Sequence, residues 1–310
     1  MKNFLVVLAG LVCVCVAINC VQAEVIPAAG SNSVKAVEVS GHWRNGEPLA
    51  PGASIELGDE LRALVGVTSL HNPPSNAPAY WKSTVSEEIT GLVYDLELTS
   101  LGGTGLDSNG LPQTGTILYY SPLRRNGLSA SDDHYGQAGG GGDIGGFGGT
   151  WGGVAELYDD LSPDLGVLMA TNPSDWVTGN PSARDSFPNA SDGSAWLSGV
   201  FLDLQSMGVI SAPQGSVYMV QFLTAEAASG YGFVNIFDGL AAPGIVFSAF
   251  GPHLDATFAT TISLASANSD SWQANADDPI LFDVAIPEPV TLLTVGVGAS
   301  LLGLVRRRRR

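Results

Sequence analysis

Residues 88–99, with the sequence EITGLVYDLELT, decide the fold class. Leucine or tyrosine occupies every second position from Leu92 to Leu98, and the positions between, from Val93 to Thr99, are mostly polar. A period of two residues is typical of a β-strand with one face in the core, because successive side chains of a strand point to opposite faces. We therefore expect a half-buried strand whose inner face holds Leu92, Tyr94, Leu96 and Leu98.

Similar short apolar runs, bounded by Gly, Pro, Asn and Asp, recur on both sides of this stretch. The other runs predicted as strands are 34–39, 54–57, 61–70, 116–120, 154–158, 167–170, 196–204, 216–223, 231–237, 245–249, 256–264 and 280–284. Helix signals are few, with one short turn expected at 223–228. So many short strands without a linker predict an all-β fold, namely a single antiparallel β-sandwich of jelly-roll type over residues 24–285.

Residues 136–153, GQAGGGGDIGGFGGTWGG, interrupt this pattern. We interpret them as a flexible surface loop of that domain, with a ligand-contacting loop as the alternative. A split into two domains near this stretch is the alternative organisation. A phosphate-cradling loop is excluded, because the stretch has neither the Gly-Lys-Ser/Thr ending nor any basic residue.

Residues 1–23 have the parts of a secretory signal peptide. Lys2 gives a basic start, residues 4–18 are apolar, and small residues precede an expected signal-peptidase cut between Ala23 and Glu24. A lipoprotein signal on Cys20 is the alternative, although the residues before Cys20 lack the usual leucine. The N-terminal sequence therefore predicts that the protein is exported.

Processing would change both the cysteine content and the charge of the chain. All three cysteines lie within the range 1–23, so the mature chain would have no disulfide, thiolate metal site or cysteine nucleophile. Loss of Lys2 and of the five terminal arginines would leave 7 of the 13 basic residues, and loss of Glu288 would leave 29 of the 30 acidic ones. The mature net charge of about −22 makes nucleic acid a poor partner.

The C-terminal stretch 286–310, IPEPVTLLTVGVGASLLGLVRRRRR, consists of a proline-containing segment, an apolar run and a basic end. The prolines at 287 and 289 disfavour a helix around them. Residues 290–305 would form a helix of about 24 Å, which is slightly short for a hydrocarbon core of about 30 Å. The terminal arginines would hold the end on the cytoplasmic side as a membrane stop. They are Arg306, Arg307, Arg308, Arg309 and Arg310.

This tail resembles a PEP-CTERM sorting signal of Gram-negative bacteria in its Pro287-Glu288-Pro289 motif, its glycine-containing apolar helix and its arginine cluster. The resemblance covers only residues 286–310. It implies processing by an exosortase-type enzyme after transient anchoring in the inner membrane, and delivery to the cell surface or extracellular matrix. It also implies an association with extracellular polysaccharide and biofilm.

Two kinds of ligand site have some support in the mature region. Trp81, Trp151 and Trp176 lie in polar or glycine-rich surroundings and are candidate carbohydrate contacts, with core packing as the alternative. Asp107 and Asn109, in the sequence DSNG, are candidate ligands of a structural calcium ion, with a turn-forming role as the alternative. No other cofactor is expected.

Enzymatic chemistry has little support. The sequence has no HExxH and no Gly-x-Ser-x-Gly, and the four histidines, interpreted as single surface residues, are not at metal-ligand spacing. The main hypothesis is therefore a non-enzymatic exported surface or matrix protein. A carbohydrate-binding module, with or without calcium, is the alternative, and a polysaccharide-active hydrolase with paired carboxylates is the third hypothesis.

Overall fold

The structure is a computed structural model that describes residues 25, 27–72, 78–84, 87–123, 151–161, 165, 171–176, 187–242, 245, 255–264 and 272–284. The predicted signal peptide, the sorting tail and residues 136–150 of the glycine-rich stretch lie outside these residues. The predicted strand at 167–170 and residues 246–249 of the predicted strand at 245–249 also lie outside them.

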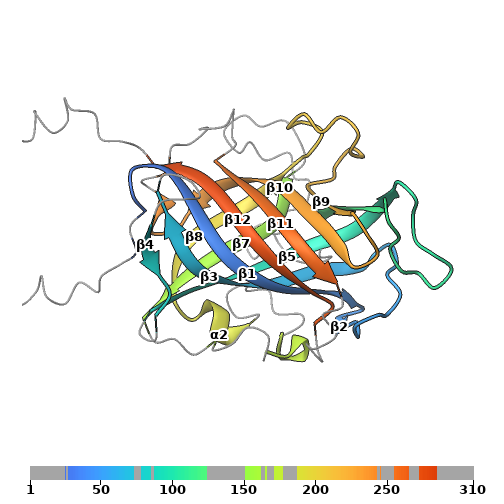
Figure 1. The fold of residues 1–310 in the computed structure, drawn as a ribbon, viewed down its shortest axis with the longest axis horizontal. Helices are drawn as coiled ribbons and strands as arrows, with labels where there is room; N and C mark the ends of the chain where they lie inside the picture. Colours follow the sequence, from blue (N-terminus) through green and yellow to red (C-terminus); the bar gives the residue numbers. More distant parts are fainter. Residues whose placement is uncertain are drawn as a thin grey trace, which may run out of the picture.

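Antiparallel β-strands make up most of the described chain (Figure 1). They are β1 (Gly30–Arg44), β2 (Glu47–Pro48), β3 (Glu60–His71), β4 (Ala79–Lys82), β5 (Glu88–Gly102), β6 (Ile117–Pro122), β7 (Trp151–Asp160), β8 (Ser194–Leu202), β9 (Tyr218–Phe222), β10 (Ala227–Asp238), β11 (Ala256–Leu264) and β12 (Ala274–Val284). Two short helices, η2 (Pro173–Asp175) and α2 (Pro188–Ser191), lie between β7 and β8 in the sequence. The all-β prediction is confirmed.

Eight of the strands close into a barrel. The hydrogen-bonded order is β3-β1-β12-β11-β10-β8-β7-β5, and β5 pairs back to β3. In Figure 1 the strands of the two walls cross one another at a steep angle. We expected two packed sheets, but the β3–β5 pairing joins what would be two sheet edges, so the result is a closed barrel with extra strands. Closure removes edge strands that could otherwise pair with another chain.

One wall of this barrel is divided between two strand pairs. Between β5 and β10, the strands β7 and β8 fill one end of the wall, and β6 and β9 fill the other. Residues 88–94 of β5 pair with β7, and residues 96–102 pair with β6. Likewise, residues 228–232 of β10 pair with β9, and residues 234–238 pair with β8.

Asp95 lies where β5 changes partner, and it corrects the prediction for this strand. Its φ of 58° is left-handed, and the β3–β5 register shifts beside it. This is a β-bulge, which turns the following residues over by one position. Leu92 and Tyr94 therefore face outward, whereas Leu96 and Leu98 pack inside with Val93. The single inner face predicted for these four residues was wrong.

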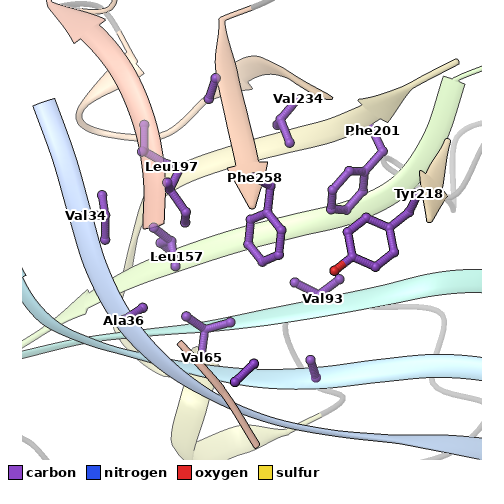
Figure 2. Packing of buried hydrophobic residues seen from close by; sticks show 14 of the residues in the cluster. Val34, Ala36, Val65, Val93, Leu157, Leu197, Phe201, Tyr218, Val234 and Phe258 are labelled. Carbon is purple, nitrogen blue, oxygen red and sulfur yellow. The ribbon is translucent and has the colours of Figure 1, made fainter. Parts of the chain in front are cut away.

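The barrel interior is filled by apolar side chains from alternate positions of the strands. Figure 2 shows Phe258 of β11 next to Phe201 of β8 and Tyr218 of β9, at ring-centroid distances of 5.9 and 6.1 Å. A Cβ atom on Gly232 would lie 2.7 Å from the Phe201 ring, so glycine in β10 leaves the space that these rings occupy. An eight-stranded barrel is about wide enough for such side chains to fill it.

A second apolar layer covers part of the outer surface of the barrel. Outward side chains of β1, β3, β5 and β7 pack there against residues of the segment between β7 and β8, including Trp176 and Phe187. This layer explains why β3 and β5 are buried on both faces.

The remaining predictions for local structure had mixed outcomes. The predicted strand at 256–264 coincides with β11, and most others overlap a strand of the structure. The run at 54–57 is an irregular turn, and residues 223–228 form bends that lead into β10 instead of a helical turn. Strands β2 and β4 were not predicted, because each is too short to show a period.

Candidate ligand-binding cavity

A cavity of about 360 Å³ occupies the end of the barrel where β6 and β9 form the divided wall. Its walls come from β1, β3, β6, β9, β11 and β12, and its rim includes residues 51–53 and 111–112. The main apolar side chains of the walls are Leu61, Leu118, Val220, Phe222, Ile262 and Leu264.

Small residues line the cavity in addition to its larger apolar side chains. Ala53 and Ala225 lie at its rim, and Ala274 begins β12 beside it. At the other end, the interior among the strands is nearly closed: the second cavity, lined by Val65, Leu157 and their neighbours, has a volume of only about 30 Å³. Of these two cavities, the larger therefore lies at the end of the barrel where β6 and β9 form the wall.

The polar side chains in the lining are few, and three of them, His42, Tyr120 and Gln273, are joined by hydrogen bonds. Gln273 Oε1 lies 2.9 Å from the backbone nitrogen of His42 and 2.8 Å from its Nδ1. His42 Nε2 lies 2.9 Å from the hydroxyl of Tyr120. The amide nitrogen of Gln273 donates to the carbonyl of Ala50 at 3.3 Å. We call Ser40, His42, Tyr120 and Gln273 the polar corner of the cavity.

These contacts settle the proton positions in the polar corner. The backbone N–H of His42 can only donate, so the atom of Gln273 that faces it is the oxygen. The same oxygen must then accept from Nδ1, which carries the imidazole proton. In the neutral ring Nε2 is consequently an acceptor, and the Tyr120 hydroxyl donates to it.

Burial is the main electrostatic influence on the polar corner. It lowers the pKa of His42 below its ordinary value of 6.5, an effect partly opposed by the Gln273 hydrogen bond and the charge of Asp59 and assisted by Arg44. Burial also raises the pKa of Tyr120, and Asp59 adds to that increase. His42 and Tyr120 are therefore both uncharged at neutral pH.

Arg44 and Asp59, whose charges act on the polar corner, pair with each other and are not part of the cavity lining. Arg44 donates from Nε and Nη2 to the two carboxylate oxygens of Asp59, each at 2.8 Å. Two such parallel bonds are a strong arrangement for a carboxylate. Among the described residues, no Asp, Glu, Lys or Arg side chain lines the cavity.

The candidate carbohydrate contacts are not brought together. Trp81 lies on the edge strand β4 and is partly buried against the core. Trp176 was expected in exposed surroundings, but it is 3% exposed in the outer layer, with Trp43 and Phe187 at ring-centroid distances of 5.8 and 5.9 Å. The prediction failed for Trp176 because a neighbouring polar sequence does not show what the ring packs against. Trp151 begins β7, and its side chain is outside the described residues.

The predicted calcium ligands form a turn. Asp107 Oδ1 accepts from the backbone N–H groups of Asn109 at 2.8 Å and Leu111 at 2.9 Å. These bonds lower the pKa of Asp107. Within the described residues, no group of three or more His, Cys, Asp or Glu side chains could hold a metal ion. Calcium binding at this turn stays a prediction.

The outer layer contains a second set of buried polar groups. Arg62 of β3 donates from Nη2 to Glu60 Oε2 at 2.6 Å. Its guanidinium lies 5.1 Å from the ring centroid of Trp43 and 5.4 Å from that of Trp176. This is a packed cation–π arrangement.

The sequence did not identify the polar corner. We expected His42 to be a surface histidine, yet it is buried. It stands at an inward position of β1 with Val34 and Ala36, and that alternation was the signal that could have placed it inside. Gln273 offered no such signal, because the strand β12 begins only after it.

Comparison with protein families, with curated proteins and with solved structures gives no match for this chain. In the part of the chain that the structure describes, no helix is both long and apolar enough to cross a membrane.

Proposed function

We propose that the chain is an exported, non-enzymatic cell-surface or matrix protein whose barrel binds a small apolar molecule in the cavity. The observation that carries the binding function is the cavity of about 360 Å³ with apolar walls and one polar corner. Ligand sites typically have volumes of about 300–1,000 Å³, mostly apolar walls and a few placed polar groups. The mouths of barrels are common positions for them.

The size and position of the cavity support this proposal. Protein interiors hold few voids larger than a water molecule, whereas this space of about 360 Å³ opens at one end of the barrel. A ligand that fills it would remove the apolar side chains of its walls from water, which is favourable.

The export half of the proposal is supported by the two ends of the sequence. Residues 1–23 carry the signal-peptide pattern, and residues 286–310 carry the PEP-CTERM pattern. The expected partners are signal peptidase, an exosortase-type processing enzyme, the inner membrane during anchoring, and extracellular polysaccharide. The final location proposed is the cell surface or the space outside it.

Carbohydrate binding is the second candidate function. Tyr80 is exposed and Trp81 partly exposed on the edge strand β4. Exposed aromatic rings can stack on sugars, although these two neighbours point to opposite faces of the strand. This candidate predicts binding on a glycan array, and no binding at millimolar sugar would count against it.

The cavity function is tested with N-phenyl-1-naphthylamine, a neutral dye that fluoresces in apolar surroundings. Protein is purified without detergent after expression of the full chain, and its mass is recorded. We expect saturable dye binding with one site per chain. Unsaturable or absent binding would refute the cavity function.

A further inference from the structure

The polar corner narrows the kind of molecule that the cavity would take. We infer that the ligand is a neutral, mainly apolar alcohol whose hydroxyl group lies between Tyr120 and Gln273 while its hydrocarbon part lies against the apolar walls. This inference rests on the proposed binding function.

The first step is the hydrogen-bonding capacity that the polar corner still has. Nδ1 of His42 donates to Gln273, and Nε2 accepts from Tyr120, so both ring nitrogens are used. The Tyr120 hydroxyl donates its proton to His42 but keeps lone pairs that can accept. The side-chain amide of Gln273 has two N–H groups, and one of them donates to Ala50. Apart from the hydroxyl of Ser40, which can both donate and accept, one acceptor on Tyr120 and one donor on Gln273 therefore remain.

A ligand hydroxyl group would match the remaining hydrogen-bonding groups of Tyr120 and Gln273. A hydroxyl group offers one donor and can accept, so it can donate to the Tyr120 oxygen and accept from the second N–H of Gln273. An ether can only accept, and a carboxylate can only accept. An alcohol is thus the simplest head group that satisfies Tyr120 and Gln273 at once.

The lining also determines which ligand charge the cavity can accept. The described lining has no Lys, Arg, Asp or Glu side chain that could pair with an ion, and Arg44 is already bonded to both oxygens of Asp59. An ion moved from water into such a site without a partner would carry a desolvation penalty of several kcal/mol. Neutral ligands should therefore bind in preference to carboxylates and amines of the same chain length.

The size of the cavity limits the hydrocarbon part. An apolar cavity of about 150 Å³ holds benzene. By that proportion, about 360 Å³ encloses about 14 non-hydrogen atoms, and a slightly larger molecule such as the dye would extend past the open rim. An alcohol with a chain of about 8 to 12 carbons, or one aromatic ring with a short chain, fits this limit.

The test is competition against bound N-phenyl-1-naphthylamine at pH 8 with four probes of matched length. They are 1-decanol, its isomer 1-methoxynonane, sodium decanoate and decyltrimethylammonium. We expect 1-decanol to displace the dye at a concentration about ten-fold or more below either ion and about five-fold below the ether, which corresponds to one hydrogen bond of about 1 kcal/mol.

A Tyr120 variant tests whether the preference for the alcohol depends on the polar corner. In Tyr120→Phe, the preference for the alcohol over the ether should fall to less than two-fold, whatever the affinity for the dye itself. If this variant does not fold, the comparison of the four probes on the unchanged protein decides the question alone.

The outcomes separate this inference from the function on which it rests. Dye binding with equal displacement by alcohol and ether, or with better displacement by decanoate, overturns the alcohol inference and leaves the cavity function in place. Absence of saturable dye binding overturns both.

Discussion

Gln273 Oε1 accepts two hydrogen bonds from a single residue, His42: one from the backbone N–H at 2.9 Å and one from Nδ1 at 2.8 Å. Gln273 comes just before β12, whereas His42 lies near the end of β1, 231 positions earlier. Because β1 and β12 are neighbours in the barrel, one amide group both fixes the imidazole and closes the polar corner of the cavity. The binding site therefore depends on contacts between residues far apart in the sequence.

Replacing Gln273 tests how much this amide contributes to stability. Gln273→Met would leave the buried Nδ1–H of His42 without its acceptor, and an unsatisfied buried group costs about 1–3 kcal/mol. We expect a loss of that size in the free energy of unfolding, measured by urea denaturation. Gln221→Met, at an exposed position of β9, is the matched control and should change it by less than about 0.5 kcal/mol. Equal effects in the two variants would contradict the role given to Gln273.

The protonation of His42 should appear in the pH dependence of stability. Burial lowers its pKa in the folded protein, while the unfolded chain keeps a pKa near 6.5. Below pH 6.5 the unfolded state therefore binds more protons, so the contribution of neutral His42 is present above this pH and is lost as the pH falls toward the folded-state value.

The measurement is the stability difference between the unchanged protein and His42→Gln at pH 8 and at pH 5. We expect the advantage of the unchanged protein to shrink at pH 5. Asp59 and Arg44, the charged groups whose fields act on His42, are present in both proteins, so the comparison isolates His42. A difference that is constant or grows toward pH 5 would show that His42 is not buried in its neutral form.

The cavity rim offers a variant that blocks access without touching the polar corner. Ala225→Trp places a large side chain at the rim, in an exposed turn between β9 and β10. We expect it to weaken binding of N-phenyl-1-naphthylamine by about ten-fold or more. Ile210→Trp adds similar bulk at a position that is 85% exposed and outside the cavity lining, and it should leave the dye affinity within two-fold. Equal binding by both variants would place the dye elsewhere on the protein.

Arg62 and Glu60 should behave as a coupled buried pair. Removing one partner of such a pair typically costs about 3–5 kcal/mol, because the other is left as an uncompensated charge. We therefore expect Arg62→Met to cost that much in thermal or urea unfolding. The double variant Arg62→Met with Glu60→Gln should recover most of the loss. Additive losses would indicate that the two side chains stabilise the outer layer independently of each other.

The sequence predicted the composition of the barrel better than its closure. Period-two patterns identified most strands, because apolar alternation depends on nearby residues only. The bulge at Asp95 could not be predicted in this way, since aspartate fits an exposed strand position as well as a left-handed one. That single residue turns Leu96 and Leu98 inward and marks where β5 passes from β7 to β6. Closure by the β3–β5 pairing is equally non-local.

The cavity was beyond sequence analysis for a related reason. The cavity lining is assembled from strands and loops far apart in the sequence, and its small residues Ala53, Ala225 and Ala274 look ordinary in their own segments. The aromatic residues gave a misleading signal, because the polar surroundings of Trp176 in the sequence hide its burial against Trp43. Sequence patterns predict features that repeat along one strand. They do not predict a cavity whose walls come from six different strands.

The sorting tail is tested by replacing Pro287, Glu288 and Pro289 with alanine in the full chain. If an exosortase-type enzyme recognises this motif, the variant should keep its apolar run and basic end and should stay uncut in the inner membrane.

The control replaces Thr291 and Thr294 with alanine, which keeps the motif and makes the run more apolar, so it should be processed normally. Mass spectrometry of the mature protein and cell fractionation provide the measurements. Because the five arginines and Glu288 would leave with the tail, its removal also lowers the net charge by about four, which native electrophoresis detects independently. An unchanged mass and location in the motif variant would refute the assignment of residues 286–310 as a sorting signal.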